Sequence, residues 1–317
     1  MYGLLVIKPR KIKKMKIKCL MFSIITIAIL FSCKTNAIKG VEVKKELNYI
    51  PYYLKVYEAD SLYITKNYQR SYDILDSLFQ KYEPLNMPSY YEVNRYYQLK
   101  IILDKKIKNE DFLKLISKYR LTDTTLKKDS IFNIYYLKEK NFFDKNYAKL
   151  NEINKSSLKL ELRKEISLMI ENDQLYRKQS YHANIDKQNT IDSINSKRLI
   201  EIFNDYGFPD EKIIGNSLVD GKIVDVGVLL LHTKDSLRIN YFLPKIMDFI
   251  KEGKAKSQYY ANMYDQYLLY KGQEQYYGSY DNKTQIPIKE LNRRRATIGL
   301  PNYGYEKWRI NKLFPKH

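Results

Sequence analysis

The sequence predicts a mostly all-α protein with two helical parts that follow an export signal. Between residues 51 and 149, apolar residues recur at intervals of three and four, as they do along a helix that buries one face. Residues 158–176 and 185–206 show the same period, and Gly207 with Pro209 is a typical helix stop. We therefore expect helical domains over 51–150 and 155–317, separated by a boundary at 151–155.

The N-terminus has the layout of a secretory signal. Residues 8–18 are strongly basic, and residues 19–31 form an apolar run that is shorter than the roughly 20 residues of a membrane-spanning helix. The next residues, Leu30-Phe31-Ser32-Cys33, resemble a bacterial lipobox, although Phe31 is bulkier than usual. The resemblance implies a signal peptide over 1–32, lipidation of Cys33 and a tether over 33–50. A plain cleaved signal and a short signal anchor are the alternatives, and Met15 is a second possible start.

Removal of the signal changes what the charge and the cysteines imply. The chain has 56 basic and 36 acidic residues, and residues 1–32 take away seven basic residues and no acidic one, which leaves a net charge of +13. The remaining basic residues alternate with acidic ones, as on a solvated helix surface, so we expect no nucleic-acid partner. Cys19 leaves with the signal and Cys33 carries the lipid, which excludes a disulfide, a cysteine nucleophile and a thiolate metal site.

Residues 51–150 contain one unit that resembles a tetratricopeptide repeat. The positions near that consensus are Ala59, Leu62, Ser71, Leu75 and Leu78, with Pro84 near its closing proline. Pro84 and Pro88 interrupt the helical period, which resumes over 90–103. We expect tetratricopeptide-like helical hairpins, whose many tyrosines line either a core or a peptide-binding groove.

The second part is predicted to be a compact α-helical domain. Asp210 is placed to cap the turn after Pro209. Residues 224–232 are almost wholly apolar and predict a buried helix, and further helices are expected over 237–252, 258–270, 288–298 and 305–313. Residues 272–288 contain Gly, Asn and Pro without a period, so they predict a loop or small hairpin near the C-terminus.

Polar residues follow a distinctive order in this second part. They are Asp173, Gln174 and Arg177, then Asp192 and Asn195, then His232, Asp265, Gln275, Tyr277 and Gly278, and finally Arg294 and Arg295. In this order and spacing, residues 157–315 resemble a bacterial domain-of-unknown-function family, number 6624. The resemblance implies a fold and a set of polar positions, but no reaction. The chain departs from the family at Phe208, Gln266, Ser279 and Tyr280, where Trp, Arg, Thr and Gln are usual.

These polar residues form the candidate site. Asp192 and Asn195 share one helix face, and Asp225 and His232, seven residues apart, would do so on a continuous helix. A histidine beside a carboxylate can serve as a general base, and Asp192, His232 and Asp265 together could act as catalytic groups or hold a divalent metal. The candidate binding residues are Asn195, Asp173, Gln174, Gln275, Tyr277, Arg294 and Arg295. In the structural alternative, these groups bond one another and the backbone, and the arginines are solvated helix charges.

Two functions compete on this evidence. The first is a lipid-anchored cell-envelope protein, on the periplasmic face of the outer membrane, that binds or scaffolds a peptide, protein or glycan. The alternative is a hydrolase-like, possibly metal-assisted enzyme centred on Asp192, His232 and Asp265. The chain contains no GxSxG, no HExxH and no phosphate-binding glycine loop, so no strong motif predicts a cofactor.

Overall fold

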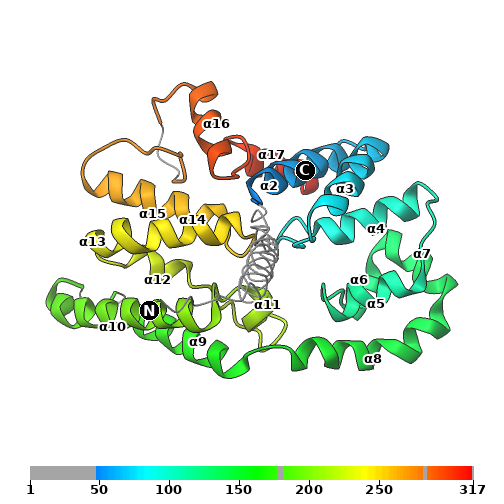
Figure 1. Cartoon of the computed structure of the whole chain (residues 1–317), viewed down its shortest axis with the longest axis horizontal. Helices are drawn as coiled ribbons and strands as arrows, with labels where there is room; N and C mark the ends of the chain where they lie inside the picture. Colours follow the sequence, from blue (N-terminus) through cyan, green and yellow to red (C-terminus); the bar gives the residue numbers. More distant parts are fainter. Residues whose placement is uncertain (1–47, 178–180, 281–283, 316–317) are drawn as a thin grey trace, which may run out of the picture. The chain divides into compact units, whose positions relative to one another are not determined.

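A computed structural model describes residues 48–177, 181–280 and 284–315 (Figure 1). All regular structure in these residues is helical, which confirms the predicted all-α class. The predicted signal peptide, Cys33 and nearly all of the tether lie outside the described residues.

The first half consists of helices of 6 to 17 residues that pack on one another. They are α2 (Ile50–Ile64), α3 (Tyr68–Lys81), α4 (Glu92–Ile102), α5 (Asn109–Ser117), α6 (Asp123–Lys128), α7 (Ser130–Lys138) and α8 (Lys140–Ser156). Helices α2 and α3 form a hairpin in which the buried Ser71 hydroxyl donates to the Ala59 carbonyl at 2.8 Å. Small residues at this crossing let the two backbones approach closely. The tetratricopeptide-like character of the array stays a prediction.

The second half combines long helices with several helical segments of five residues or fewer. They are α9 (Leu160–Leu175), η1 (Tyr181–Asn184), α10 (Ile185–Tyr206), α11 (Glu211–Ile214), α12 (Gly227–Leu231), α13 (Asp235–Leu237), η2 (Arg238–Phe242), α14 (Leu243–Lys251), α15 (Ser257–Tyr270), α16 (Ile288–Thr297) and α17 (Tyr305–Leu313). Helix α10 ends at Gly207, whose φ of +74° suits glycine, as the sequence predicts. The described residues between α15 and α16 form an irregular loop, also as predicted.

Two segments differ from their predictions. Helix α12 covers only part of 224–232, because the Asp225 carboxylate accepts the Gly227 N–H at 2.8 Å and forms a turn before the helix. Asp225 and His232 therefore do not share one helix face. The predicted helix over 237–252 begins as the π-helix η2, and Pro244 follows at the start of α14. Proline has no N–H for an i→i−4 bond, which favours an irregular turn just before it.

The main core contains side chains from both predicted domains. It includes Tyr52 and Val56 of α2, Ile202 of α10 and Phe249 of α14. The Tyr53 hydroxyl donates to the Ile250 and Ala255 carbonyls at 3.0 and 3.2 Å. The predicted boundary at 151–155 falls inside α8, which is a continuous helix.

A buried ion pair joins the last helix to the first described one. Arg309 of α17 donates its Nε–H to Asp60 of α2 at 2.7 Å, and the Tyr305 hydroxyl donates to the same carboxylate at 2.8 Å. A second, smaller core around Phe112, Phe132 and Phe143 fills the space between α5, α7 and α8.

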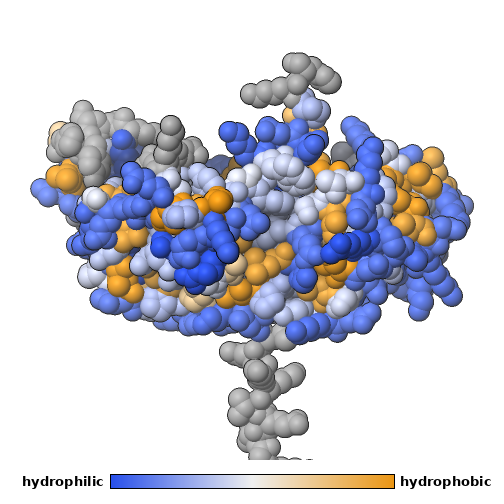
Figure 2. Space-filling view, turned by 90° about the horizontal axis from the view of Figure 1, so that it is seen from above, coloured by the Kyte–Doolittle hydropathy of each residue, from blue (hydrophilic) through white to orange (hydrophobic). Residues whose placement is uncertain are grey.

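Many of the basic and acidic residues that alternate along the sequence lie on the surface of the helices. In Figure 2, hydrophilic residues cover most of the face shown, and hydrophobic residues form separate patches between them. Exposed pairs such as Lys164 with Glu161 at 2.7 Å join basic and acidic residues along one helix. None of the described helices is long and apolar enough to cross a membrane.

Candidate functional site

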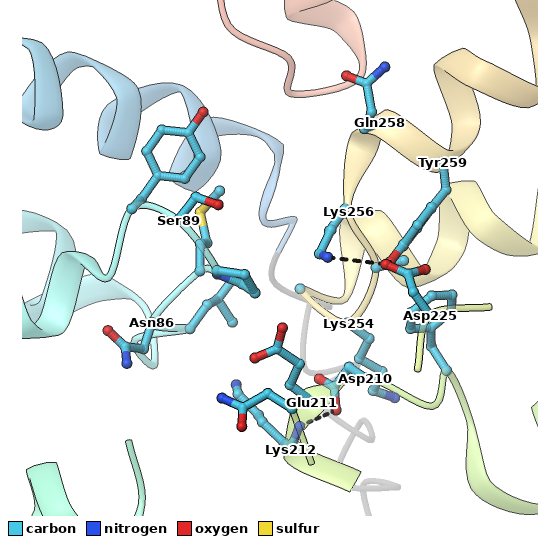
Figure 3. Close-up of a pocket in the computed structure, with 18 of the residues that line it drawn as sticks. Asn86, Ser89, Asp210, Glu211, Lys212, Asp225, Lys254, Lys256, Gln258 and Tyr259 are labelled. Carbon is cyan, nitrogen blue, oxygen red and sulfur yellow. Dashed lines mark hydrogen bonds and ion pairs between the residues drawn. The ribbon is translucent and has the colours of Figure 1, made fainter. Parts of the chain in front are cut away.

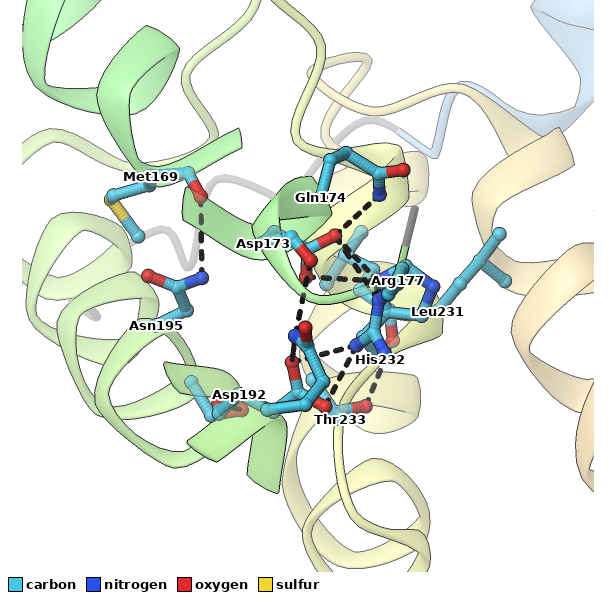
Figure 4. A network of polar contacts seen from close by, with 12 residues as sticks. Met169, Asp173, Gln174, Arg177, Asp192, Asn195, Leu231, His232 and Thr233 are labelled. Carbon is cyan, nitrogen blue, oxygen red and sulfur yellow. Dashed lines mark hydrogen bonds and ion pairs between the residues drawn. The ribbon is translucent and has the colours of Figure 1, made fainter. Parts of the chain in front are cut away.

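Several of the predicted site residues meet in one polar network (Figure 4). Asp173 lies in the last turn of α9, and Arg177 follows two residues after the end of that helix. Asp192 projects from α10, and His232 ends α12. We call these four side chains the His232 network. The network joins three helices that are separated by up to 59 positions in the chain.

The bonds of the His232 network are short. His232 Nδ1 lies 2.8 and 2.9 Å from the two carboxylate oxygens of Asp173. Arg177 Nη2 lies 2.6 and 2.7 Å from the carboxylate oxygens of Asp192, and its Nε lies 3.2 Å from His232 Nδ1. Nδ1 donates to Asp173 when it carries a proton and accepts from Arg177 when it does not. The network thus stays bonded in either tautomer.

The side-chain amides of Gln188 and Gln174 add further hydrogen bonds to the two aspartates of the network. Gln188 donates to Asp192 at 2.9 Å and to the Asp173 carbonyl at 3.0 Å, and Gln174 donates to the Asp173 carboxylate at 2.7 Å. The side chain of Asp173 is 1% exposed and that of Asp192 is 13% exposed. Buried carboxylates with this many donors are held in place as charged braces between helices.

Asp265, the third predicted catalytic residue, lies elsewhere. It is fully buried on α15, and its oxygens accept the backbone N–H groups of Tyr276, Tyr277 and Ser279 at 2.7, 2.9 and 2.8 Å. These bonds fix the loop after α15 and occupy both of its oxygens. The described residues contain no group of three or more His, Cys, Asp or Glu side chains placed to hold a metal ion. The structure therefore does not assemble Asp265 with Asp192 and His232 as a metal site.

The predicted binding residues also bond to the protein itself. Asn195 donates to the Met169 carbonyl at 3.3 Å, and Gln275 accepts the Tyr280 N–H at 2.7 Å. Tyr277 is buried, and burial raises the pKa of its phenol. These residues join elements of the fold, in agreement with the structural alternative.

Arg294 and Arg295 have different surroundings. Arg295 is buried, donates to the Tyr277 carbonyl at 2.8 Å and to the Pro301 carbonyl at 2.7 Å, and has a pKa lowered by burial. Arg294 bonds Glu290 at 2.9 Å and lies 4.2 Å from the centre of the Tyr276 ring. Arg295 connects two loops, and Arg294 is part of a helix ion pair.

A large opening lies away from the His232 network, and none of the network's side chains lines it. It is a cavity of about 520 Å³ between the loop 85–91, helix α2, helix α11 and the segments 223–226 and 253–259 (Figure 3). We call it the tyrosine cavity. Its volume lies within the roughly 300–1,000 Å³ of ligand sites.

Aromatic rings form much of the wall of the tyrosine cavity. The rings of Tyr57 and Tyr90 lie 4.9 Å apart, and those of Phe208 and Tyr259 lie 5.5 Å apart. Burial raises the pKa of Tyr57 and of Tyr259, so both phenols stay protonated at neutral pH. Such rings give a ligand flat apolar contact area with hydroxyl groups at the edge.

Two of the carboxylates beside these rings are bonded within the protein. Asp210 accepts the Lys212 and Ile213 N–H groups at 2.9 and 3.1 Å, and thus caps α11 as the sequence predicts. Asp225 accepts the Tyr259 hydroxyl at 2.8 Å and lies 3.5 Å from Lys256 Nζ. Neither carboxylate is free for a ligand without loss of these bonds.

Glu211 differs from these two carboxylates. No ammonium or guanidinium of the described residues lies within 4.0 Å of it, and Figure 3 shows its carboxylate directed toward the space between Asn86 and Lys256. Burial raises the pKa of Glu211, and the more distant charges of Lys256 and Arg120 and a hydrogen bond from Asn216 offset this effect in part. The cavity therefore contains a partly desolvated carboxylate without a close counter-charge.

The tyrosines of residues 51–150 allow a peptide-binding groove as one alternative, but the sequence does not predict this cavity or the place of Glu211 in it. The residues of this cavity come from six separate segments, one of which contributes only Leu300, and match no motif. Two local signals point to it: the proline-rich loop 84–91 between two helices, and the lysines at 254 and 256 between α14 and α15. Loops held by rigid helices often carry binding residues.

Comparison with protein-family models, with curated proteins and with solved structures found no match to the chain. The resemblance to domain family 6624 thus stays a prediction, as does the lipobox.

Proposed function

We propose that the protein is a lipid-anchored component of a bacterial cell envelope that binds its ligand in the tyrosine cavity. The observation that carries this proposal is a cavity of about 520 Å³ walled by aromatic rings and containing a carboxylate without a close counter-charge. Buried charges in proteins are normally paired, so an unpaired one in an open cavity favours a ligand over a structural role.

The ligand class that this wall favours is a segment of peptide or glycan. Protonated tyrosines offer flat faces for apolar side chains or sugar rings, and their hydroxyls offer hydrogen bonds. Tyr57 on α2 and Tyr259 on α15 are held in place by their helices, so that little ordering of these two rings is needed when a ligand binds. Nucleic acid is not proposed, because the acidic groups Asp210, Glu211 and Asp225 would repel phosphates.

A substitution that narrows the cavity tests this proposal. Gln258 lines the cavity, whereas Lys271 is exposed just after α15 and is not among the lining residues. Mature full-length protein in detergent is titrated calorimetrically with capped tetrapeptides and with cell-wall glycan fragments. We expect Gln258→Trp to abolish binding of whichever probe the native protein binds, and Lys271→Trp to retain it. Equal binding by both variants, or no binding by the native protein, would contradict the proposal.

The proposed location depends on Cys33. Lipid on this cysteine would hold the protein on the periplasmic face of the outer membrane, because two or three acyl chains give stable anchoring. We expect Cys33→Ala to move the protein from the membrane fraction to the soluble fraction after cell lysis. If the variant fractionates like the native protein, the anchor is not on Cys33.

A hydrolase-like enzyme is the second candidate, and one contact favours it. Asp173 bonds His232 Nδ1 at 2.8 Å, and no hydrogen bond from the described residues reaches Nε2. A carboxylate-held imidazole with a free Nε2 is the arrangement of a general base. His232→Asn separates the candidates: loss of peptide or ester hydrolysis in a folded variant supports the enzyme, whereas lower stability without any change in hydrolysis supports a brace.

A further inference from the structure

We infer that the tyrosine cavity binds a peptide through a primary ammonium group, such as a lysine side chain, that pairs with Glu211. This inference rests on the proposed binding function and adds the chemical class of the ligand. It starts from the charges around the cavity, because a buried charge without a partner costs free energy unless a ligand pairs with it.

Apart from Lys212, which is exposed and has no carboxylate within 4.0 Å among the described residues, the other charged groups that line the cavity already have partners. Asp210 is bonded by two backbone N–H groups, and Asp225 by the Tyr259 hydroxyl. Lys254 forms an ion pair with Glu252 at 2.6 Å, and Lys256 lies 3.5 Å from Asp225. Glu211 alone among the lining carboxylates has neither an ion pair nor a backbone N–H bond within the described part of the chain.

The rings around Glu211 suit a cation. The pKa of Tyr91 is raised mainly by burial and next by the charge of Glu211. The pKa of Tyr259 is raised mainly by burial, next by Asp225 and then by Glu211. Both phenols are therefore close enough to sense this carboxylate. Because Tyr91, Tyr259 and Glu211 all line this cavity, a cation that pairs with Glu211 would lie in a cavity walled in part by aromatic rings, which attract ammonium groups through their quadrupoles.

An anionic ligand fits this cavity less well. It would meet the carboxylates of Asp210, Glu211 and Asp225 together, and two of the three lining lysines, Lys254 and Lys256, are already engaged with acids. A neutral glycan would leave Glu211 unpaired. A peptide ammonium supplies the missing charge, and its aliphatic stem can pack against the tyrosines.

The test uses matched tetrapeptides, acetylated at the N-terminus and amidated at the C-terminus, with a single variable residue. Mature full-length protein in detergent is titrated with Ac-Ala-Lys-Tyr-Ala-amide and with its norleucine and glutamate counterparts. Norleucine keeps the aliphatic stem and removes the charge. Because charge-assisted hydrogen bonds contribute about 1.5–3 kcal/mol, we expect the lysine peptide to bind at least about tenfold more tightly than the norleucine peptide.

Three variants assign this difference to the site. Glu211→Gln should make the lysine and norleucine peptides bind equally, and Glu161→Gln, on the exposed face of α9, should preserve the preference for lysine. Lys256→Gln removes a competing cation and should strengthen binding of the lysine peptide. This third variant keeps the test valid even if Glu211→Gln does not fold.

The outcomes separate the inference from the proposed function. If both the lysine and the norleucine peptide bind equally to the native protein, and Gln258→Trp abolishes both, the cavity binds peptides but the inference is wrong. Preference for the glutamate peptide, or binding of glycans alone, also overturns the inference while the binding function stands. If no probe binds, both proposals fail.

Discussion

The His232 network and the tyrosine cavity handle buried charge in opposite ways. In the network, Asp173 and Asp192 are bonded by Arg177, His232 and neighbouring amides. In the cavity, Glu211 has no cation within 4.0 Å among the described residues. Both regions contain acidic and basic side chains, but the acids of the network are paired with close partners, whereas Glu211 faces a cavity without a close counter-charge.

This difference shows how a polar cluster can be assigned a role. Charged groups that pair with one another help to hold the helices in their arrangement, and they have no unpaired charge left to bind a ligand. A charge that stays unpaired at the edge of a cavity lowers the stability of the free protein, and this cost is recovered when a complementary ligand binds. The predictions below test whether the two regions really differ in this way.

The largest effect is expected when the cation of the His232 network is removed. Arg177→Ala leaves Asp192 without its guanidinium partner and removes the guanidinium that lies 3.5 Å from Asp173, and both carboxylates are largely buried. Breaking a buried ion pair costs about 3–5 kcal/mol. We expect urea denaturation to show a loss of this size in the free energy of unfolding.

The control for this change is an exposed arginine with similar bonds. Arg198 binds Glu165 through Nε at 2.5 Å and Nη2 at 3.1 Å, but both side chains are about one-third exposed. Arg198→Ala should cost less than about 1 kcal/mol, because exposed ion pairs contribute little. Equal losses in the two variants would mean that the His232 network is not a brace.

A smaller effect is expected at Asp265. Asp265→Ala leaves three backbone N–H groups without their acceptor, and each such loss is partly relieved by water or loop movement. We expect a loss of about 2–3 kcal/mol in the free energy of unfolding, with unchanged peptide binding in the tyrosine cavity. Asp248→Ala, at an exposed position of α14, is the matched control and should change stability by less than about 0.5 kcal/mol. Loss of binding with intact stability at Asp265 would instead indicate a functional role.

Most of the fold is predictable from local sequence. Helices α10 and α17 begin and end at the predicted residues, because apolar period, Gly207 and the helix termini are all local signals. The segment 224–232 is mispredicted because periodicity cannot show that the Asp225 side chain forms a turn in place of the first helical residues.

The candidate site is only partly predictable, because the order of polar residues along the chain does not show which of them meet in the fold. The order of polar residues leads to Asp173, Asp192 and His232, which do meet in space. Asp265 follows the same order but bonds its own loop. The tyrosine cavity depends on which helices pack together, and neither Tyr57 nor Glu211 belongs to any pattern that shows they line the same cavity.

The smallest effect on stability is expected at Glu211, where the substitution should stabilise the protein, whereas the substitutions above destabilise it. Because burial raises the folded-state pKa of this carboxyl, it stabilises the fold fully only below its ordinary value of 4.5, and that contribution is lost as the pH rises through the raised pKa. Glutamine never ionises, so Glu211→Gln should be more stable than the native protein at pH 7, by up to about 0.5 kcal/mol, and the gain should disappear below pH 4.5. Melting temperatures from circular dichroism at pH 4, 5.5 and 7 measure this trend.

Glu161→Gln is the control for the pH series, because Glu161 lies on an exposed helix face beside Lys164. Its stability should follow that of the native protein at every pH. A gain from Glu211→Gln at pH 4 that equals the gain at pH 7 would show that lost charge is not the cause. If the gain is confined to neutral pH and the same variant no longer distinguishes lysine from norleucine peptides, then one unpaired carboxylate both destabilises the free cavity and selects its ligand.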